Sequence, residues 1–288
     1  MMDANLLYWK NHGESVFSRL KIWVNLLDPS FLLTSNTEIQ ETYNQLRSAE
    51  KFNKKDEHSW NISLVVASFL PHRNIKPTLF WQFLLQSYTA GFNYANRNCS
   101  SEKGQTPSPK QLLLIAGTVS YATCAGALPQ IIVNRLGIRS LFIQNFFRFF
   151  ATIPLSAALA FFNVFTVREE ECQNGIQVFD SNGNSVGLSK AAAEKAVMET
   201  ALSRAVLFGT TAAVPSLLVS VLQRTRIFQK NALLVAPIRH ISVAFVLGLM
   251  IPLSFSLYPQ LGMIRKENVD EDLQAKVAEE QLFYHRGL

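Results

Sequence analysis

Four polar side chains recur on one side of an otherwise apolar segment at residues 77–96. They are Gln82, Gln86, Thr89 and Asn93, and their spacing places them on one stripe of a helix. An amide is costly to expose to acyl chains, so we expect this stripe to point into a bundle of helices. Two roles fit it: hydrogen bonds that hold neighbouring helices together, or a polar lining for a small solute.

A second stripe lies in the apolar segment 149–167. Arg148, Thr152, Ser156 and Asn163 follow spacings of four, four and seven residues, which predicts another inward polar face. Arg148 stands at the edge of the segment, where a long side chain can also reach the membrane surface. The two stripes are the candidate sites for a bound solute.

Other residue types that do chemistry are scattered. The five histidines show no ligand spacing, the three cysteines form no CxxC pair, and no motif for nucleophilic, phosphate-binding or zinc-dependent catalysis occurs. The acidic run at residues 169–171 could bind a cation, but such a run is more often solvated surface. We therefore predict a protein that is not an enzyme and has no cofactor and no metal site.

The composition indicates which elements must position these side chains. Of 288 residues, 17% are charged and 11% are aromatic, which excludes a disordered chain and makes an ordinary soluble enzyme a poor fit. Runs of about 20 residues without charge, long enough to cross a bilayer, predict an all-α membrane protein with about five transmembrane helices. The predicted spans are 77–96, 111–134, 149–167, 205–223 and 241–264, and the last four contain Pro129, Pro154, Pro215 and Pro252. Interrupted helices of this kind occur in transporters and also in membrane scaffolds.

The regions outside the spans predict further elements. Residues 1–76 form a predicted N-terminal helical segment with a polar helix at 38–57 and an amphipathic helix at 16–27, which lies either on the membrane surface or against the rest of the chain. The apolar run 62–71 is too short to span and predicts an interfacial or re-entrant piece. In the connection 168–204, Asn182-Gly183 predicts a β-hairpin and Ser189 the N-cap of a helix that leads into the fourth span. Residues 265–288 are a predicted C-terminal tail.

Charge predicts an orientation. Five crossings put residues 1–76, 135–148 and 224–240 on one face, and the two short loops among them carry 3 and 4 basic residues without an acid. By the positive-inside tendency the N-terminus then lies on the cytoplasm-like side, which would be the matrix if the membrane were the mitochondrial inner membrane, and the C-terminus lies on the other side. Asp3, Glu14 and Asp28 interrupt the first 30 residues, which predicts internal targeting and no cleaved leader.

Several motifs carry a resemblance to a known family. Trp81-Gln82, Gln86-Ser87 and the run FNYANRN at residues 92–98 resemble the signature of the sideroflexins, and the likeness extends over nearly the whole chain. It continues in Asn163 and Arg168, in Gly175-Ile176-Gln177-Val178, in Ser203-Arg204, in Tyr258-Pro259-Gln260 and in the terminal FYHRGL. The family's HPDTG box is absent, and Ala160 stands where the family has an asparagine. These departures make the chain most similar to the divergent fourth member of the family.

The resemblance implies a multi-pass protein of the inner mitochondrial membrane. Sideroflexins are carriers of serine and related small amino acids, linked to iron and haem homeostasis, and the fourth member is associated with assembly of respiratory complex I. Two functions of different class follow: a small amino-acid transporter, or a membrane assembly factor that binds complex I assembly proteins. The candidate substrate-binding residues are Gln82, Gln86, Asn93, Asn163 and Arg168. The expected partners are the lipid bilayer, small amino acids or assembly proteins, and no nucleic acid.

Overall fold

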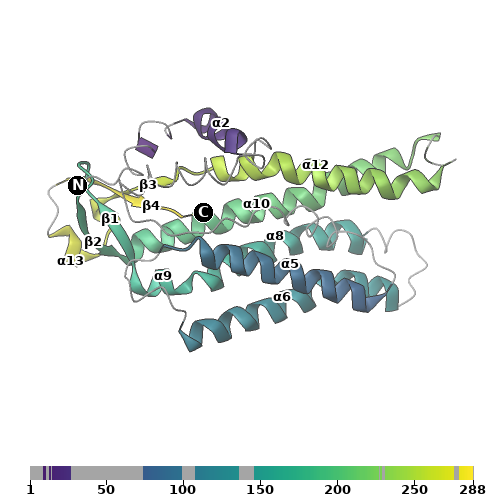
Figure 1. Cartoon of the computed structure of the whole chain (residues 1–288), viewed down its shortest axis with the longest axis horizontal. Helices are drawn as coiled ribbons and strands as arrows, with labels where there is room; N and C mark the ends of the chain where they lie inside the picture. The colour runs from purple at the N-terminus through teal and green to yellow at the C-terminus, as the bar shows by residue number, and fades with distance from the viewer. Residues whose placement is uncertain are drawn as a thin grey trace, which may run out of the picture.

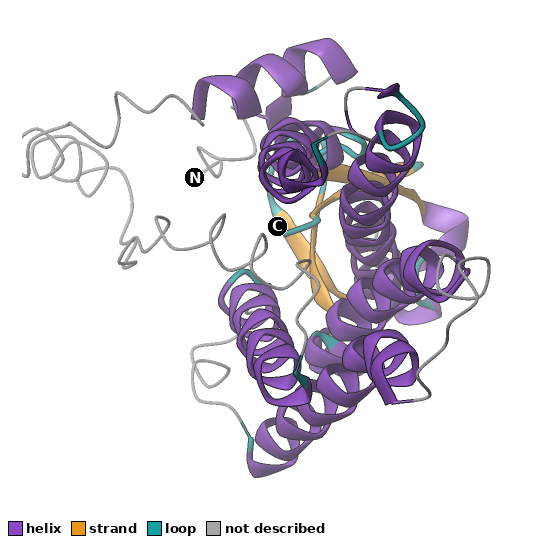
Figure 2. Cartoon of the chain, turned by 90° about the vertical axis from the view of Figure 1, so that its right-hand side faces the viewer, coloured by secondary structure: helices purple, strands orange, loops and turns teal. Residues whose placement is uncertain are grey.

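Long helices lie side by side in a bundle that carries a small sheet at one end (Figure 1). The computed structural model describes residues 9–10, 13, 15–26, 74–98, 108–135, 146–226, 228, 231–275 and 279–287. The bundle consists of α5 (Ile75–Ala95), α6 (Pro109–Arg135), α8 (Thr152–Val167), α10 (Lys190–Leu222) and α12 (Val235–Ser256). We call the end with the sheet the sheet end and the opposite one the far end. Viewed along the bundle from the far end, the sheet lies behind the helices (Figure 2).

The bundle helices alternate in direction. Asn98, just after α5, donates to the carbonyl of His285 in the sheet at 2.9 Å, and Ser108, just before α6, donates to Glu170 at 2.6 Å. The chain then returns to the sheet end at the close of α8, leaves it along α10 and returns along α12. An alternating bundle is what successive membrane crossings require.

Three of the described helices are long and apolar enough to cross a membrane: residues Pro109–Val133 of α6, α10 and α12. The helix α8 is apolar but has 16 residues, and α5 carries the polar stripe. Large apolar side chains are exposed along these helices, for example Leu113, Leu217 and Phe245. Apolar surface of this extent fits contact with lipid, so the protein is a mostly helical membrane protein. The first and third predicted spans, 77–96 and 149–167, stay predictions.

The helix boundaries show where the sequence prediction held. Ser189 is the N-cap of α10, because its hydroxyl accepts the backbone N–H of Ala192. The predicted helix start and the predicted span 205–223 thus form one continuous helix of 33 residues. The predicted end of the last span at residue 264 is wrong, because α12 ends at Ser256 and Leu261–Arg265 is a strand, β3.

The prolines do not all interrupt helices. Pro129, Pro215 and Pro252 lie inside α6, α10 and α12, as predicted. Pro154 is the third residue of α8, and a short π-helix, η3 (Phe146–Ala151), runs directly into that helix. The N–H that proline lacks is therefore missing close to the point where the helix type changes. The third predicted span therefore begins with a change of helix type and not with a break at Pro154.

The sheet joins two distant parts of the chain. The predicted hairpin is present as β1 (Ile176–Phe179) and β2 (Ser185–Ser189), which pair antiparallel. The strands β3 and β4 (Gln281–His285) come from the tail, and the order is β2-β1-β4-β3. Side chains of β1, β3 and β4 pack on the first turns of α10, with Val178, Leu282 and Tyr284 fully buried. The tail that was expected only as an extension completes this sheet.

Short helices complete the sheet end. They are α9 (Glu169–Asn174), η5 (Lys266–Asn268) and α13 (Glu271–Gln274), while η4 (Ala232–Leu234) leads into α12 at the far end. Asp270, ahead of α13, accepts the backbone N–H of Lys190 at 2.9 Å and so fixes the tail to the start of α10. The sheet, the tail and α10 therefore pack as one unit.

The N-terminal part of the described chain lies at the sheet end. The helix α2 (Val16–Leu26) packs on the end of α12, with the rings of Trp23 and Phe255 4.9 Å apart. Lys10 donates to the carbonyl of Ser181 in the hairpin turn at 3.0 Å. This contact contradicts the prediction that residues 1–76 and 168–204 lie on opposite faces, because residues 9–26 share the sheet end with the hairpin. Counting charge-free runs misses this, since it assumes that the N-terminal segment stays beside the first span.

Of the two alternatives for residues 16–27, packing against the chain is confirmed. Arg19 is 5% exposed, whereas Phe17 is 83% exposed, so the helix does not bury its apolar side chains alone. The predicted segments 38–57 and 62–71 lie outside the described residues.

The close packing of β3 on β4 gives a test of the sheet. A methyl group at Gly262 would overlap the ring of Tyr284, which is fully buried. We expect Gly262→Ala to destabilise the protein by about 1–3 kcal/mol, the usual cost of overpacking. The readout is the thermal unfolding midpoint of purified protein in detergent. Gly248→Ala in α12 is the matched control, because nothing lies within 4 Å of its added methyl group. Equal midpoints for the two variants would contradict this packing.

Candidate functional site

The two predicted polar stripes meet between α5 and α8. The Nδ2 of Asn93 donates to Oδ1 of Asn163 at 2.9 Å, and the Nδ2 of Asn163 lies 3.4 Å from the hydroxyl oxygen of Thr89. Asn93 is 3% exposed and Asn163 is 1% exposed. We call these three side chains the amide seam. Oδ1 of Asn93 has no donor, so the seam contains an acceptor that its own contacts leave free.

The remaining stripe residues take different places. Gln86 is buried on the same helix as Asn93. Gln82 lies against α6, where a side chain at Gly126 would come within 2.7 Å of its Oε1. Thr152 and Ser156 donate to carbonyls of their own helical segment, at Phe147 and Thr152. The side chain of Arg148 lies outside the described residues. The structure therefore brings Asn93 and Asn163 into contact and leaves Gln82 and Gln86 along the same helix.

Arg168 belongs to a different network at the sheet end. It caps α8 and begins α9, and its guanidinium makes two hydrogen bonds to the carboxylate of Glu171, one of them 2.7 Å from Nη2 to Oε2. It also donates to the hydroxyl of Thr200 in α10 and to the carbonyl of Arg286 after β4. Both charged side chains are buried. The guanidinium is thus occupied by the protein's own groups, which indicates a structural role.

The acidic run 169–171 does not form a common site. Glu171 pairs with Arg168, Glu170 accepts from Ser108, and Glu169 accepts from Gln173. Among the described residues, no group of three or more histidine, cysteine, aspartate or glutamate side chains is placed to hold a metal ion. Each carboxylate has its own partner.

Two buried arginines were missing from the predicted site. Arg204 in α10 and Arg286 after β4 are 5% and 1% exposed, and the Arg204 guanidinium lies 4.2 Å from the ring centroid of Phe255 and 5.3 Å from that of Phe92. Sequence reasoning drew the fourth span to begin at residue 205, just after this charge. The signal was present in Ser203-Arg204, but a search for charge-free runs excludes any arginine that points inward.

Burial changes the acid–base behaviour of the groups beside the sheet. Burial lowers the pKa of Arg286 to about 10, so that side chain keeps its charge at neutral pH. Burial and the nearby carboxylate of Glu199 raise the pKa of Tyr284. Burial, together with Glu171 and Glu194, raises the pKa of Cys172 to about 11, so its thiol stays protonated. These groups are therefore suited to hydrogen bonding and not to proton transfer near neutrality.

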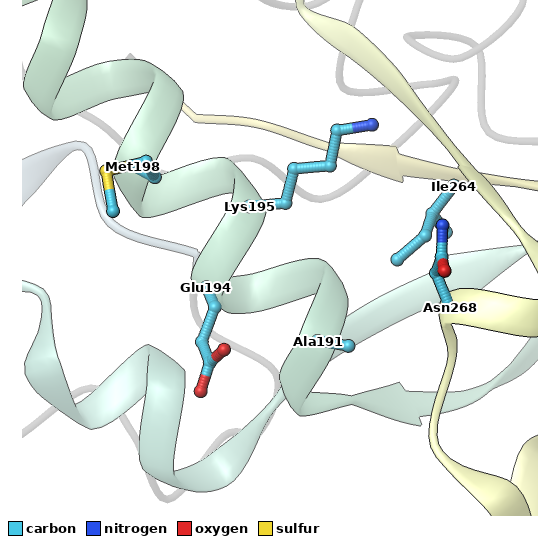
Figure 3. Close-up of a pocket in the computed structure, with 6 residues that line it drawn as sticks. All are labelled: Ala191, Glu194, Lys195, Met198, Ile264 and Asn268. Carbon is cyan, nitrogen blue, oxygen red and sulfur yellow. The ribbon is translucent and has the colours of Figure 1, made fainter.

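A separate pocket of about 360 Å³ lies between α10 and the tail (Figure 3). Lys195 extends toward β3, where its Nζ donates to the carbonyl of Met263, and Glu194 points away from it. The other lining residues are Ala191, Met198, Ile264 and Asn268. The pocket is open and of mixed polarity, and it lies outside the amide seam.

Comparison with known proteins assigns the chain to a family. The model of the family described as Sideroflexins matches residues 57–288. The chain belongs to the sideroflexin family. It is 47% identical to Sideroflexin-4 of Danio rerio and 32% identical to Sideroflexin-4 of Mus musculus, with both chains covered completely in each case. It is 29% identical to Sideroflexin-5 of Homo sapiens over 95% of this chain and 90% of that protein. No solved structure matches this sideroflexin significantly.

The Arg168 network gives a test in this sideroflexin. Glu171→Gln would leave a buried guanidinium without its carboxylate, which costs about 3–5 kcal/mol when a buried pair is broken. We expect a clear fall in the thermal unfolding midpoint and in the amount of inserted protein. Glu169→Gln on the same helix is the control, because Glu169 is partly exposed and bonded only to the side chain of Gln173 at an exposed position. A loss of equal size in both variants would contradict the special role of the buried pair.

Proposed function

We propose that this sideroflexin carries a small amino acid across the inner mitochondrial membrane. The proposal rests on two buried side-chain amide oxygens that accept no hydrogen bond from the described residues. They are Oδ1 of Asn93 in the amide seam and Oε1 of Gln111 at the start of α6. A buried acceptor without a donor is costly, and an ammonium group supplies donors. The mitochondrial membrane and the class of substrate come from the family resemblance.

The position and form of the helices also support a carrier. Asn93 and Asn163 lie within two turns of the sheet-end termini of α5 and α8, so a bound solute would be near that side of the membrane. The helices α6, α10 and α12 contain prolines in their interior, as helices that bend during transport often do. Arg168 is not part of this proposal, because Glu171 occupies it. The absent HPDTG box and Ala160 leave the choice of amino acid to experiment.

Uptake into liposomes tests the carrier and the seam together. We expect saturable uptake of at least one member of a panel of small amino acids, and we expect Asn93→Leu and Asn163→Leu to abolish it while the proteins insert normally, since leucine suits a bilayer helix. If the seam serves only to hold the helices, each change should lower stability by about 0.6 kcal/mol per lost hydrogen bond and leave uptake intact. Ser120→Leu is the control, because Ser120 is exposed on α6 and bonds its own backbone.

We propose an orientation in which both described ends of the chain lie on one side of the membrane. We propose that the connections between α6 and α8 and between α10 and α12, which carry basic residues without acids, face the matrix. The sheet, the tail and residues 9–26 then face the intermembrane space. The proposed location of the N-terminus, in the intermembrane space, differs from the sequence prediction, which was the matrix. The proposed location of the C-terminus is the same as in the sequence prediction.

Protease added to mitoplasts tests this orientation. Epitope tags placed before residue 1 and after residue 288 should both be removed, whereas a tag inserted after residue 230, in the connection between α10 and α12, should be spared. Loss of the C-terminal tag with survival of the N-terminal tag would contradict the contact between Lys10 and Ser181 and restore opposite sides.

A second function has its own observation. The sheet end exposes Met198, Met263 and Leu188 beside the pocket and the sheet, and such side chains suit a protein partner. We propose as the alternative an assembly factor that binds complex I assembly proteins through this surface. In cells lacking the protein, Asn163→Leu should then restore complex I while Met198→Glu with Met263→Glu fails. The reverse result, at normal protein levels, would favour transport.

A further inference from the structure

Arg204 is a buried cation without an acceptor. Neither Nη1 nor Nη2 of its guanidinium has a hydrogen-bond partner, although the side chain is 5% exposed. The rings of Phe92 and Phe255 lie beside it and offer their faces, which suits a guanidinium but leaves its N–H edge unpaired. A buried charge with an unpaired edge is costly to the folded protein, so the site calls for a counter-charge.

The neighbouring cations have partners that Arg204 lacks. Arg168 is paired with Glu171. Arg19 donates to the carbonyls of Gly13 and Ser256, and Arg286 lies 3.4 Å from the carbonyl of Phe255 and within electrostatic reach of Glu199. The carbonyls at the end of α12 carry the negative pole of that helix and serve these two arginines.

The charges at this place do not balance. The described residues include four buried arginines, Arg19, Arg168, Arg204 and Arg286. Of these, Arg168 pairs with Glu171, and Arg286 interacts with Glu199. The charged neighbours of Arg204 are Arg286 and Arg168, which repel it, and Tyr88 lies close enough to interact with it. Nε and Nη1 of Arg286 are also without acceptors. Two arginines that interact electrostatically therefore both have N–H groups without acceptors among the described residues.

We propose that Arg204, together with the free N–H groups of Arg286, binds the carboxylate of a small organic anion. The two free end nitrogens of Arg204 form the planar fork that holds a carboxylate by two parallel hydrogen bonds. The rings of Phe92 and Phe255 would then be the apolar neighbours of the ligand. Taking the anion as the α-carboxylate of the carried amino acid rests on the proposed function. The residue that recognises the carboxylate is then Arg204, on α10, and not Arg168.

The test measures binding without transport, on the full-length protein purified in lipid nanodiscs. The probes are propionate, L-alanine, ethylamine and inorganic phosphate at equal ionic strength, and the readout is the shift of the thermal unfolding midpoint. We expect propionate and L-alanine to stabilise the protein and ethylamine, which lacks the carboxylate, to have no effect. Stabilisation by phosphate alone would overturn a carboxylate site.

Arg204→Met separates a binding role from a structural one. If the role of Arg204 is to bind a ligand, methionine removes an unpaired buried charge from the unliganded protein. The thermal unfolding midpoint without ligand should then rise, and the increase of the midpoint caused by propionate should disappear. A lower midpoint with an unchanged propionate shift would overturn the proposal. Arg265→Met on β3 is the control, because Arg265 is exposed, and both of its values should match the parent protein.

Arg204→Lys covers the case in which methionine is not tolerated. Lysine keeps the charge but loses the fork, so propionate should bind about ten- to a hundredfold more weakly, as expected for lost charge-assisted hydrogen bonds. Equal binding would overturn the proposal. If propionate binding depends on Arg204 but no amino acid is taken up, the proposed transport function is contradicted and the carboxylate site at Arg204 is supported. If uptake is unaffected by Arg204→Lys, the transport function is supported and the carboxylate site at Arg204 is contradicted.

Discussion

The sheet end depends on one buried ion pair. Arg168 closes α8, and its bonds to Glu171, Thr200 and the carbonyl of Arg286 connect α8, α9, α10 and the tail at a single guanidinium. A residue other than glycine at position 287 would press on this group, because an added methyl would lie 2.9 Å from Nη2 of Arg168 and Gly287 has a φ of +75°. The path of the tail is therefore fixed by the arginine beneath it. Without that arrangement, β4 would lose its position between β1 and β3.

The same end of the molecule gathers most of the features that point to function. The amide seam lies within two turns of it, and Arg204 stands half-way along α10 beside Phe92, the residue before Asn93. The far end, where it is described, consists of helix ends and the short helices η3 and η4. This asymmetry separates a lipid-facing region built from leucine, valine and phenylalanine from a polar region in which buried charges need partners. A solute site and a partner surface would both have to be on the same side of the membrane.

The sequence predicted the parts of the fold that follow from local patterns. The hairpin at Asn182-Gly183, the N-cap at Ser189 and the inward direction of Asn93 and Asn163 are confirmed, because turn chemistry, capping and helical periodicity act over a few residues. That the two asparagines contact each other was not predicted. The pairing of β1 with β4 was not predictable from such patterns, since the two strands are about 100 residues apart and no local signal marks β4 as a strand. The contact of Lys10 with Ser181 was missed for the same reason.

The candidate site was predicted in part, and the misses have one cause. Searching for stretches without charge finds lipid-facing helices. The same search excludes any charged side chain that points into the bundle near the end of a predicted span. Arg204 was lost in this way. Arg168 was chosen, but its partner Glu171 lies three residues on, in a run that reads as solvated surface. Only the three-dimensional structure shows that Arg168 is neutralised by Glu171 and that Arg204 has no such partner among the described residues.

The place of β4 in the sheet has a consequence for how the protein is made. Its strand lies between β1 and β3, yet it is synthesised after all five bundle helices. While a ribosome is still producing α12, β1 has only β2 as a neighbour and the carbonyl of Arg286 does not yet exist. Until β4 is available, the hairpin has one edge unpaired and open to other strands. Closure of the sheet end therefore requires residues at the end of the chain, Gln281–His285.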